Sequence, residues 1–217
     1  MNIKKCLVWD KFYLDQSLRE KSLSLYKKDL IGDNIDELLF QSRHSDYCIL
    51  TWECNIVNSD YFNLCEQYIQ MLNEKTQNEW LVTGHIIDQY QNRIFHEDET
   101  YEKWKNSFFL YPITSIININ IWKSIGCPMW GKYGVEEIII PNRSLENTHD
   151  TYTPITLQSS TQIIKANVKH SWNIINESLK NNYIVYNLNY NVRKSQKYMY
   201  PEVDENVYIN YINSNVQ

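Results

Sequence analysis

A carboxylate and an amide stand two positions apart just after an apolar run of the chain. The run is Tyr47–Trp52, and the polar pair that follows it is Glu53 and Asn55. A glutamate oxygen and an asparagine amide oxygen are both ligands that Mg²⁺ or Mn²⁺ accepts. The pair therefore predicts a divalent-cation site at the end of a strand, and a plain turn is the alternative interpretation.

A second cluster follows the apolar run 80–83 and consists of Gly84, His85 and Asp88. Glycine permits a positive φ or a close approach of two backbones. We expect His85 to contact the substrate and Asp88 to act as a general base. A hydrogen-bonded turn without a chemical role is the alternative.

A third group lies in the polar segment 144–154, where His149 is followed directly by Asp150. Long polar loops often carry catalytic and binding residues. We expect both residues to be catalytic, with His149 also available as a metal ligand. Asp88, His149 and Asp150 are thus the three candidates for the group that accepts a proton from the substrate.

The chain has one locally basic segment, which contains Arg193, Lys194 and Lys197 interleaved with tyrosine. Such a cluster suits a diphosphate or a nucleic-acid backbone. A solvated surface is the alternative. The segment follows a predicted strand near the end of the sequence, a position from which it could cover a phosphate group.

The elements that must position these residues alternate between helix and strand. We expect helices over 14–30, 34–41, 61–73 and 170–180, and strands over 47–52, 80–83, 115–121, 138–140 and 183–188. This alternation predicts a single α/β domain over residues 1–205, with a mostly parallel central sheet flanked by helices and a polar tail over 206–217. Ligands of such sheets bind at the carboxyl ends of the strands, where Trp52 would contact the substrate.

Composition and charge narrow the class of protein. The 217 residues carry a net charge of −5, so the overall charge does not indicate a nucleic-acid partner. The first ten residues lack the apolar core of a signal peptide, and no apolar run approaches the roughly 20 residues of a membrane helix. The five cysteines are scattered and form no Cys-x-x-Cys pair. We therefore expect a cytoplasmic protein with reduced thiols and no membrane partner.

Three stretches taken together resemble the GT-A-fold glycosyltransferases that use nucleotide sugars. They are Tyr47–Asn55, Ile117–Trp122 and Asn147–Asp150. The family has Asp-x-Asp at the end of its strand, whereas this chain has Glu53-x-Asn55. The resemblance implies a GT-A-like fold and a nucleotide-sugar donor.

The resemblance also implies roles for particular residues. A Mn²⁺ or Mg²⁺ ion would be held by Glu53, Asn55 and His149, and the basic segment would bind the diphosphate of the donor. The sequence does not identify the donor sugar, the acceptor or the stereochemistry of transfer. A non-catalytic module that binds a nucleotide, a sugar or a protein on the same kind of sheet is the alternative function.

Overall fold

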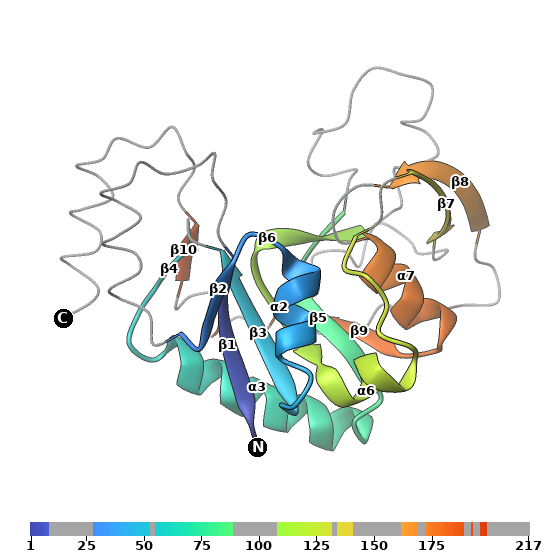
Figure 1. Cartoon of the computed structure of the whole chain (residues 1–217). Coiled ribbons are helices and arrows are strands. Elements are labelled where there is room, and N and C mark those ends of the chain that lie inside the picture. Colours follow the sequence, from blue (N-terminus) through green and yellow to red (C-terminus); the bar gives the residue numbers. More distant parts are fainter. Residues whose placement is uncertain are drawn as a thin grey trace.

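The computed structural model describes residues 1–8, 28–52, 55–88, 108–131, 134–140, 162–168, 172–188, 192 and 196–198. Its strands and helices form an α/β domain around one six-stranded sheet (Figure 1). The predicted helix 14–30 falls largely outside these ranges, as does the predicted tail 206–217. Leu30, the last residue of that predicted helix, belongs instead to a strand.

The central sheet has the strand order β2-β1-β3-β6-β5-β9. Its members are listed here in that order: β2 (Leu30–Gly32), β1 (Ile3–Val8), β3 (Tyr47–Trp52), β6 (Phe108–Asn118), β5 (Trp80–Asp88) and β9 (Ile184–Asn187). Pairings β2–β1, β1–β3 and β5–β9 are parallel. Strand β6 runs antiparallel to both β3 and β5.

The expectation of a mostly parallel sheet is therefore wrong, because the sheet is mixed. Strand β6 occupies its centre and reverses the direction of two of the five pairings. The local composition of a strand is set by burial on both faces, and burial does not encode direction. The other five strands still point the same way.

The pairing of β3 with β6 confirms that both segments lie buried at the centre of one sheet. All six residues of β3 are buried, and the described side chains of β6 from Thr114 to Asn118 are buried as well. The predicted strand 115–121 starts and ends too late, since β6 begins at Phe108 and α6 (Ile119–Ser124) begins directly after Asn118. The side chain of Asn118 accepts a hydrogen bond from the Ile121 backbone N–H and caps this helix.

Helices cover both faces of the sheet (Figure 1). Helix α3 (Tyr61–Thr76) packs on one face, while α2 (Ile35–Gln41), α6 and α7 (Trp172–Lys180) pack on the other. The predicted helices 34–41, 61–73 and 170–180 are confirmed as α2, α3 and α7, each with small shifts in its ends. Asn34 caps α2 by accepting from the backbone of Asp36 and Glu37.

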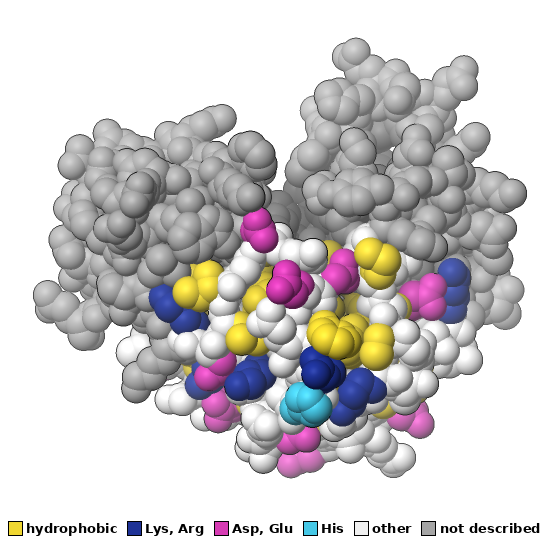
Figure 2. Space-filling view, in the orientation of Figure 1, with side chains coloured by type: hydrophobic (Ala, Val, Ile, Leu, Met, Phe, Trp, Pro, Cys, Tyr) yellow, Lys and Arg dark blue, Asp and Glu magenta, His cyan; other side chains and the backbone are white. Residues whose placement is uncertain are grey.

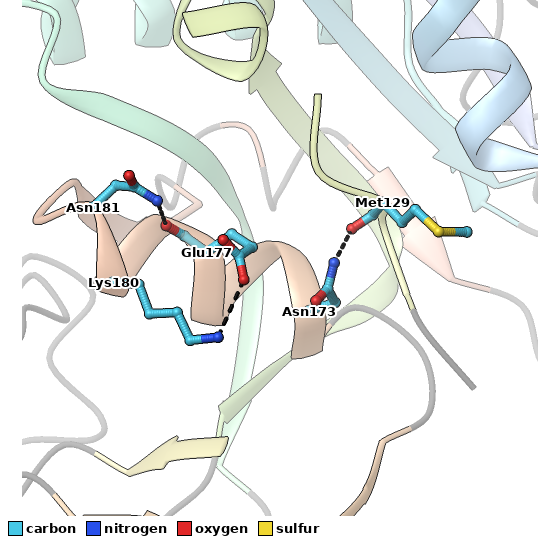
Figure 3. Close-up of polar contacts among 5 residues, drawn as sticks. All are labelled: Met129, Asn173, Glu177, Lys180 and Asn181. Atoms are coloured by element: carbon cyan, nitrogen blue, oxygen red, sulfur yellow. Dashed lines mark hydrogen bonds and ion pairs between the residues drawn. The ribbon is translucent and has the colours of Figure 1, made fainter. Parts of the chain in front are cut away.

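Helix α7 is tied to the segment that precedes β7 (Gly134–Ile140). The side-chain amide of Asn173 donates to the Met129 carbonyl, and the Ile174 backbone N–H donates to the Trp130 carbonyl. Figure 3 shows the first of these bonds, together with the ion pair of 3.2 Å between Lys180 and Glu177 one turn further along. The two hydrogen bonds fix the start of α7 against the segment at Met129 and Trp130.

Two small antiparallel pairs complete the described structure. Strand β7 pairs with β8 (Gln162–Val168), and β4 (Asn55–Val57) pairs with β10 (Gln196–Tyr198). In the described part of the chain, no helix is long and apolar enough to span a membrane.

Candidate functional site

The carboxyl ends of β1, β3, β5 and β9 lie along the same edge of the central sheet. We call this the carboxyl edge. Since β6 is antiparallel to its neighbours, it begins at this edge and interrupts the parallel set. Ligands of open α/β sheets usually bind outside the carboxyl ends of the parallel strands.

Trp52 ends β3 at the carboxyl edge, but its ring belongs to the core. It is 8% exposed, and its ring centroid lies 6.1 Å from that of Trp130 at an angle of 47°. The Trp130 backbone N–H donates to Asp36 Oδ1 over 2.6 Å. Burial raises the pKa of Asp36, and the hydrogen bond from Trp130 partly opposes this rise. Trp52 can therefore support the wall of a site more readily than it can stack on a ligand.

Asn55 is fully buried in a hydrogen-bonded cluster beneath the carboxyl edge. Its Nδ2 atom donates to Thr114 Oγ1 over 3.2 Å. The Tyr61 hydroxyl lies 2.6 Å from the same Thr114 oxygen and 3.0 Å from Thr51 Oγ1. These contacts join β3, β4, α3 and β6. They fix the amide nitrogen of Asn55 in this cluster, and the role of its amide oxygen as a metal ligand stays a prediction.

The Gly84 segment continues the strand instead of ending it. Strand β5 runs through His85 to Asp88, with Asp88 opposite Phe108 of β6. The pairing shifts between Gly84 and Ile86, which marks a β-bulge or similar irregularity at His85. The predicted strand 80–83 therefore ends too early, and the alternative of a turn at this position is wrong. The side chains of His85 and Asp88 lie outside the described part of the structure.

Gly84 is needed for close packing rather than for a positive φ. A Cβ atom at this position would lie 2.9 Å from the Thr114 carbonyl oxygen and 2.9 Å from Leu110 Cδ2. The Gly84 carbonyl accepts from the Leu188 backbone N–H over 2.7 Å. The glycine thus lets β6 approach β5 at the carboxyl edge.

The structure brings the basic segment beside the Glu53-x-Asn55 motif at the level of the backbone. In the antiparallel pair of β4 and β10, Lys197 lies opposite Ile56 and Tyr198 lies opposite Asn55. The side chain of Lys197 is outside the described part. Glu53, Arg193, Lys194, His149 and Asp150 also lie outside the described residues, so their convergence stays a prediction.

Three features of the structure were not anticipated from the sequence. Cys6 and Cys48 place their Sγ atoms 3.5 Å apart in the core, an amide-rich pocket opens at the amino edge of the sheet, and the Tyr61–Thr114 cluster fills the space below the carboxyl edge. Each joins residues from different strands and helices. The abundance of asparagine and tyrosine was visible in the sequence, but their meeting points were not.

The described residues include no group of three or more His, Cys, Asp or Glu side chains that could hold a metal ion.

The face shown in Figure 2 carries hydrophobic side chains beside Lys, Arg and His side chains. Phe40 on α2 is 58% exposed, and the Arg43 guanidinium carbon lies 4.2 Å from its ring centroid. No protein-family model, curated protein or solved structure matches this chain.

Proposed function

We propose that the carboxyl edge binds a nucleotide sugar and that the protein transfers the sugar to an acceptor. The observation that carries this proposal is the pairing of β10 with β4. It places the backbone of Lys197 opposite Ile56, three positions after Glu53 in the sequence, at a sheet edge where ligands commonly bind. Cationic and acidic groups are the two components that recognition of a diphosphate and its metal ion requires.

Each group has a defined task in this proposal. Arg193, Lys194 and Lys197 bind the diphosphate of the donor and offset the charge that develops on it as it leaves. One of Asp88, His149 and Asp150 accepts the proton of the acceptor hydroxyl. His85 lies at the strand irregularity and contacts the donor.

The residues fit a divalent cation only in part. Glu53 and His149 offer a carboxylate and an imidazole to Mn²⁺ or Mg²⁺, whereas Asn55 is buried and donates to Thr114. Asn55 therefore positions the segment. A bound cation would supply additional positive charge to the leaving diphosphate.

The burial of Asn55 also favours a second candidate function. Without an accessible amide at this position, the Glu53-x-Asn55 motif offers fewer ligands to a metal ion. A non-catalytic module that binds the nucleotide, or a sugar or protein partner, needs the basic segment but no transfer chemistry. Release of the nucleoside diphosphate separates the two functions.

The experiment is a thermal-shift screen of the full chain against UDP, GDP and dTDP sugars, with and without MnCl₂. A ligand that binds only the native state raises the melting temperature by mass action. Stabilisation together with release of the nucleoside diphosphate supports the transferase. Stabilisation without release supports the binding module, and no stabilisation by any of these compounds contradicts both the transferase and a module that binds nucleotides.

Arg193→Ala combined with Lys197→Ala tests the site itself. This double variant should weaken nucleotide binding and flatten its dependence on salt. The matched control is Lys123→Ala, which removes a cation from α6 outside β10 and the carboxyl edge. Equal affinity of the wild type and the double variant at low salt would place the basic segment outside the site.

A further inference from the structure

A pocket of about 460 Å³ opens at the amino edge of the sheet, opposite the carboxyl edge. It lies where β3 begins and β6 ends, at the paired residues Tyr47 and Asn118. Its lining consists of Met1, Asp46, Tyr47, Asn73, Asn78, Asn118, Asn120 and Ile121. The volume lies in the range of small-molecule sites, and five of the eight lining residues are Asp or Asn.

A chain of hydrogen bonds fixes the polarity of the Tyr47 hydroxyl. Trp80 Nε1 can only donate, and it donates to Asn73 Oδ1 over 2.9 Å. The Asn73 amide nitrogen therefore faces Tyr47, and it donates to the hydroxyl oxygen over 2.8 Å. The Tyr47 ring stacks on Trp80 with centroids 5.7 Å apart. The hydroxyl is thus held in place and keeps its own proton for donation to a ligand.

Two further groups on the pocket wall are also fixed by the fold. Asn118 Oδ1 accepts from the Ile121 backbone N–H over 3.3 Å, so its amide nitrogen is the atom left to donate. Asp46 Oδ2 accepts from the Asn2 backbone N–H over 2.7 Å. The other carboxylate oxygen, Oδ1, accepts from none of the described residues. The wall therefore presents two donors and one acceptor before any ligand arrives.

The side chains of the lining disfavour anionic ligands. They include the carboxylate of Asp46 and no Lys, Arg or His, and the N-terminal ammonium group of Met1 is the one cation carried by a lining residue. A phosphate would meet the Asp46 carboxylate with at most this single positive charge to offset the repulsion. Hydroxyl groups, in contrast, accept from Tyr47 and Asn118 and donate to Asp46, since each hydroxyl can do both. The exposed Asn78 and Asn120 add amides that bond in either direction.

We propose that this amide-lined pocket binds a neutral polyhydroxylated ligand of the size of a mono- or disaccharide. The site is separate from the carboxyl edge and does not depend on the function proposed there. Burial, aided by the charge of Asp46 and opposed by the hydrogen bond from Asn73, raises the pKa of Tyr47. The phenol consequently keeps its proton at neutral pH and remains a donor.

The test is a titration of the ¹⁵N-labelled full chain with glucose, galactose, mannose and N-acetylglucosamine at up to tens of millimolar, followed by amide NMR. At least one sugar should shift the amides of Tyr47, Asn78 and Asn120 in a saturable manner. Tyr47→Phe keeps the ring and removes the donor. It should weaken binding about three- to tenfold, the range of a single neutral hydrogen bond.

Two other variants protect the test against a folding defect. Asn120→Ala changes an exposed lining residue and should also weaken sugar binding. Tyr183→Phe makes the same chemical change as Tyr47→Phe but lies outside the pocket, so the affinity for the sugar should stay as in the wild type. The proposal is overturned if none of the sugars shifts these amides. It is also overturned if Tyr47→Phe and Asn120→Ala both bind as the wild type does, or if inorganic phosphate binds in place of the sugars.

Discussion

The two thiols of Cys6 and Cys48 meet in the core between β1 and β3. Their sulfur atoms lie 3.5 Å apart, and Ser42 Oγ lies 3.5 Å from Cys6 Sγ while it donates to the Leu38 carbonyl. The hydrogen bond shared with Cys6, together with burial, raises the pKa of Cys48 well above its ordinary value. Burial also raises the pKa of Cys65. Protonated, buried thiols react slowly, because the thiolate is the nucleophile. The hydrogen bond with Cys48 lowers the pKa of Cys6, so Cys6 is protected by its burial, at 3% exposure, and not by a raised pKa.

The described cysteines should consequently divide into one reactive and three protected thiols. In a Cys54→Ser background, which removes the one cysteine outside the described residues, we expect an aromatic disulfide reagent to modify the exposed Cys127 rapidly. Cys6, Cys48 and Cys65 should react only after denaturant is added. Release of the chromophore measures both phases. Rapid reaction of the native Cys54→Ser/Cys127→Ser variant would contradict the burial of the other three.

Asp36 gives a second prediction at the scale of a residue. Its pKa is raised by burial, so the native state binds this proton more tightly than the unfolded chain, where the ordinary value is about 3.9. The contribution of Asp36 to the free energy of unfolding therefore falls as the pH rises from about 4 through the raised native pKa. Asp36→Asn retains an acceptor for the Trp130 N–H and removes the titration.

The measurement is denaturant unfolding of the wild type and Asp36→Asn at several pH values between 4 and 7. The free energy of unfolding of the wild type, minus that of the variant, should decrease as the pH rises. Glu37→Gln is the matched control, because Glu37 lies exposed in the same helical turn. A difference that grows with pH would mean that the pKa of Asp36 is lowered in the native state.

At the scale of the element, the junction of β5 and β6 depends on the absence of a side chain at Gly84. An added Cβ would meet the Thr114 carbonyl oxygen at 2.9 Å and Ser115 Oγ at 3.0 Å. A backbone oxygen within a sheet cannot move aside without disturbing its neighbours. Gly84→Ala should therefore lower the free energy of unfolding by about 1–3 kcal/mol, the usual cost of overpacking.

Gly32→Ala provides the comparison for this prediction. A Cβ at Gly32 would meet only the side chain of Leu38, at 3.2 Å and beyond, and a side chain can adjust. The loss of stability in denaturant unfolding should be clearly smaller than for Gly84→Ala. If the two variants lose equal stability, the close approach of β6 to β5 is not the cause.

The elements that could be predicted are those whose local pattern and burial agree. Helix α3 has buried residues at helical spacing, such as Cys65, Ile69 and Leu72, and β3 is apolar throughout because both its faces are covered. The end of β6 could not be predicted, since the alternation of Ile and Asn after residue 116 suits a strand as well as a helix. The Asn118 cap decides between them.

The parts of the candidate site that sequence could not provide are those that depend on pairing between distant segments. The direction of β6 and the contact of β10 with β4 are long-range features, and burial alone does not specify either. The role of Asn55 depends on Thr114, which lies 59 positions further along the chain. The Glu53-x-Asn55 motif at the end of a strand indicated where a ligand could bind, but it did not indicate that the side chain of Asn55 would be buried in the core.

At the scale of the whole molecule, the sheet separates two apolar clusters that share the same strands. The cluster on the face of α2, α6 and α7 includes Leu50, while the cluster on the face of α3 includes Ile49. These neighbours in β3 are both 0% exposed and point to opposite faces. Because β3 supplies side chains to both clusters, loss of packing in one cluster should also disturb the strand on which the other cluster packs.

Ile49→Ala and Leu50→Ala should therefore weaken the same cooperative transition. Each should lower the free energy of unfolding by about 2–5 kcal/mol, as expected for truncation of a fully buried aliphatic side chain. Phe40→Ala is the control, since its side chain is exposed on α2 and should change stability by less than about 0.5 kcal/mol. Far-UV circular dichroism and tryptophan fluorescence should report coincident denaturant midpoints for each variant. Two separate transitions in either core variant would mean that the two faces of the sheet fold independently.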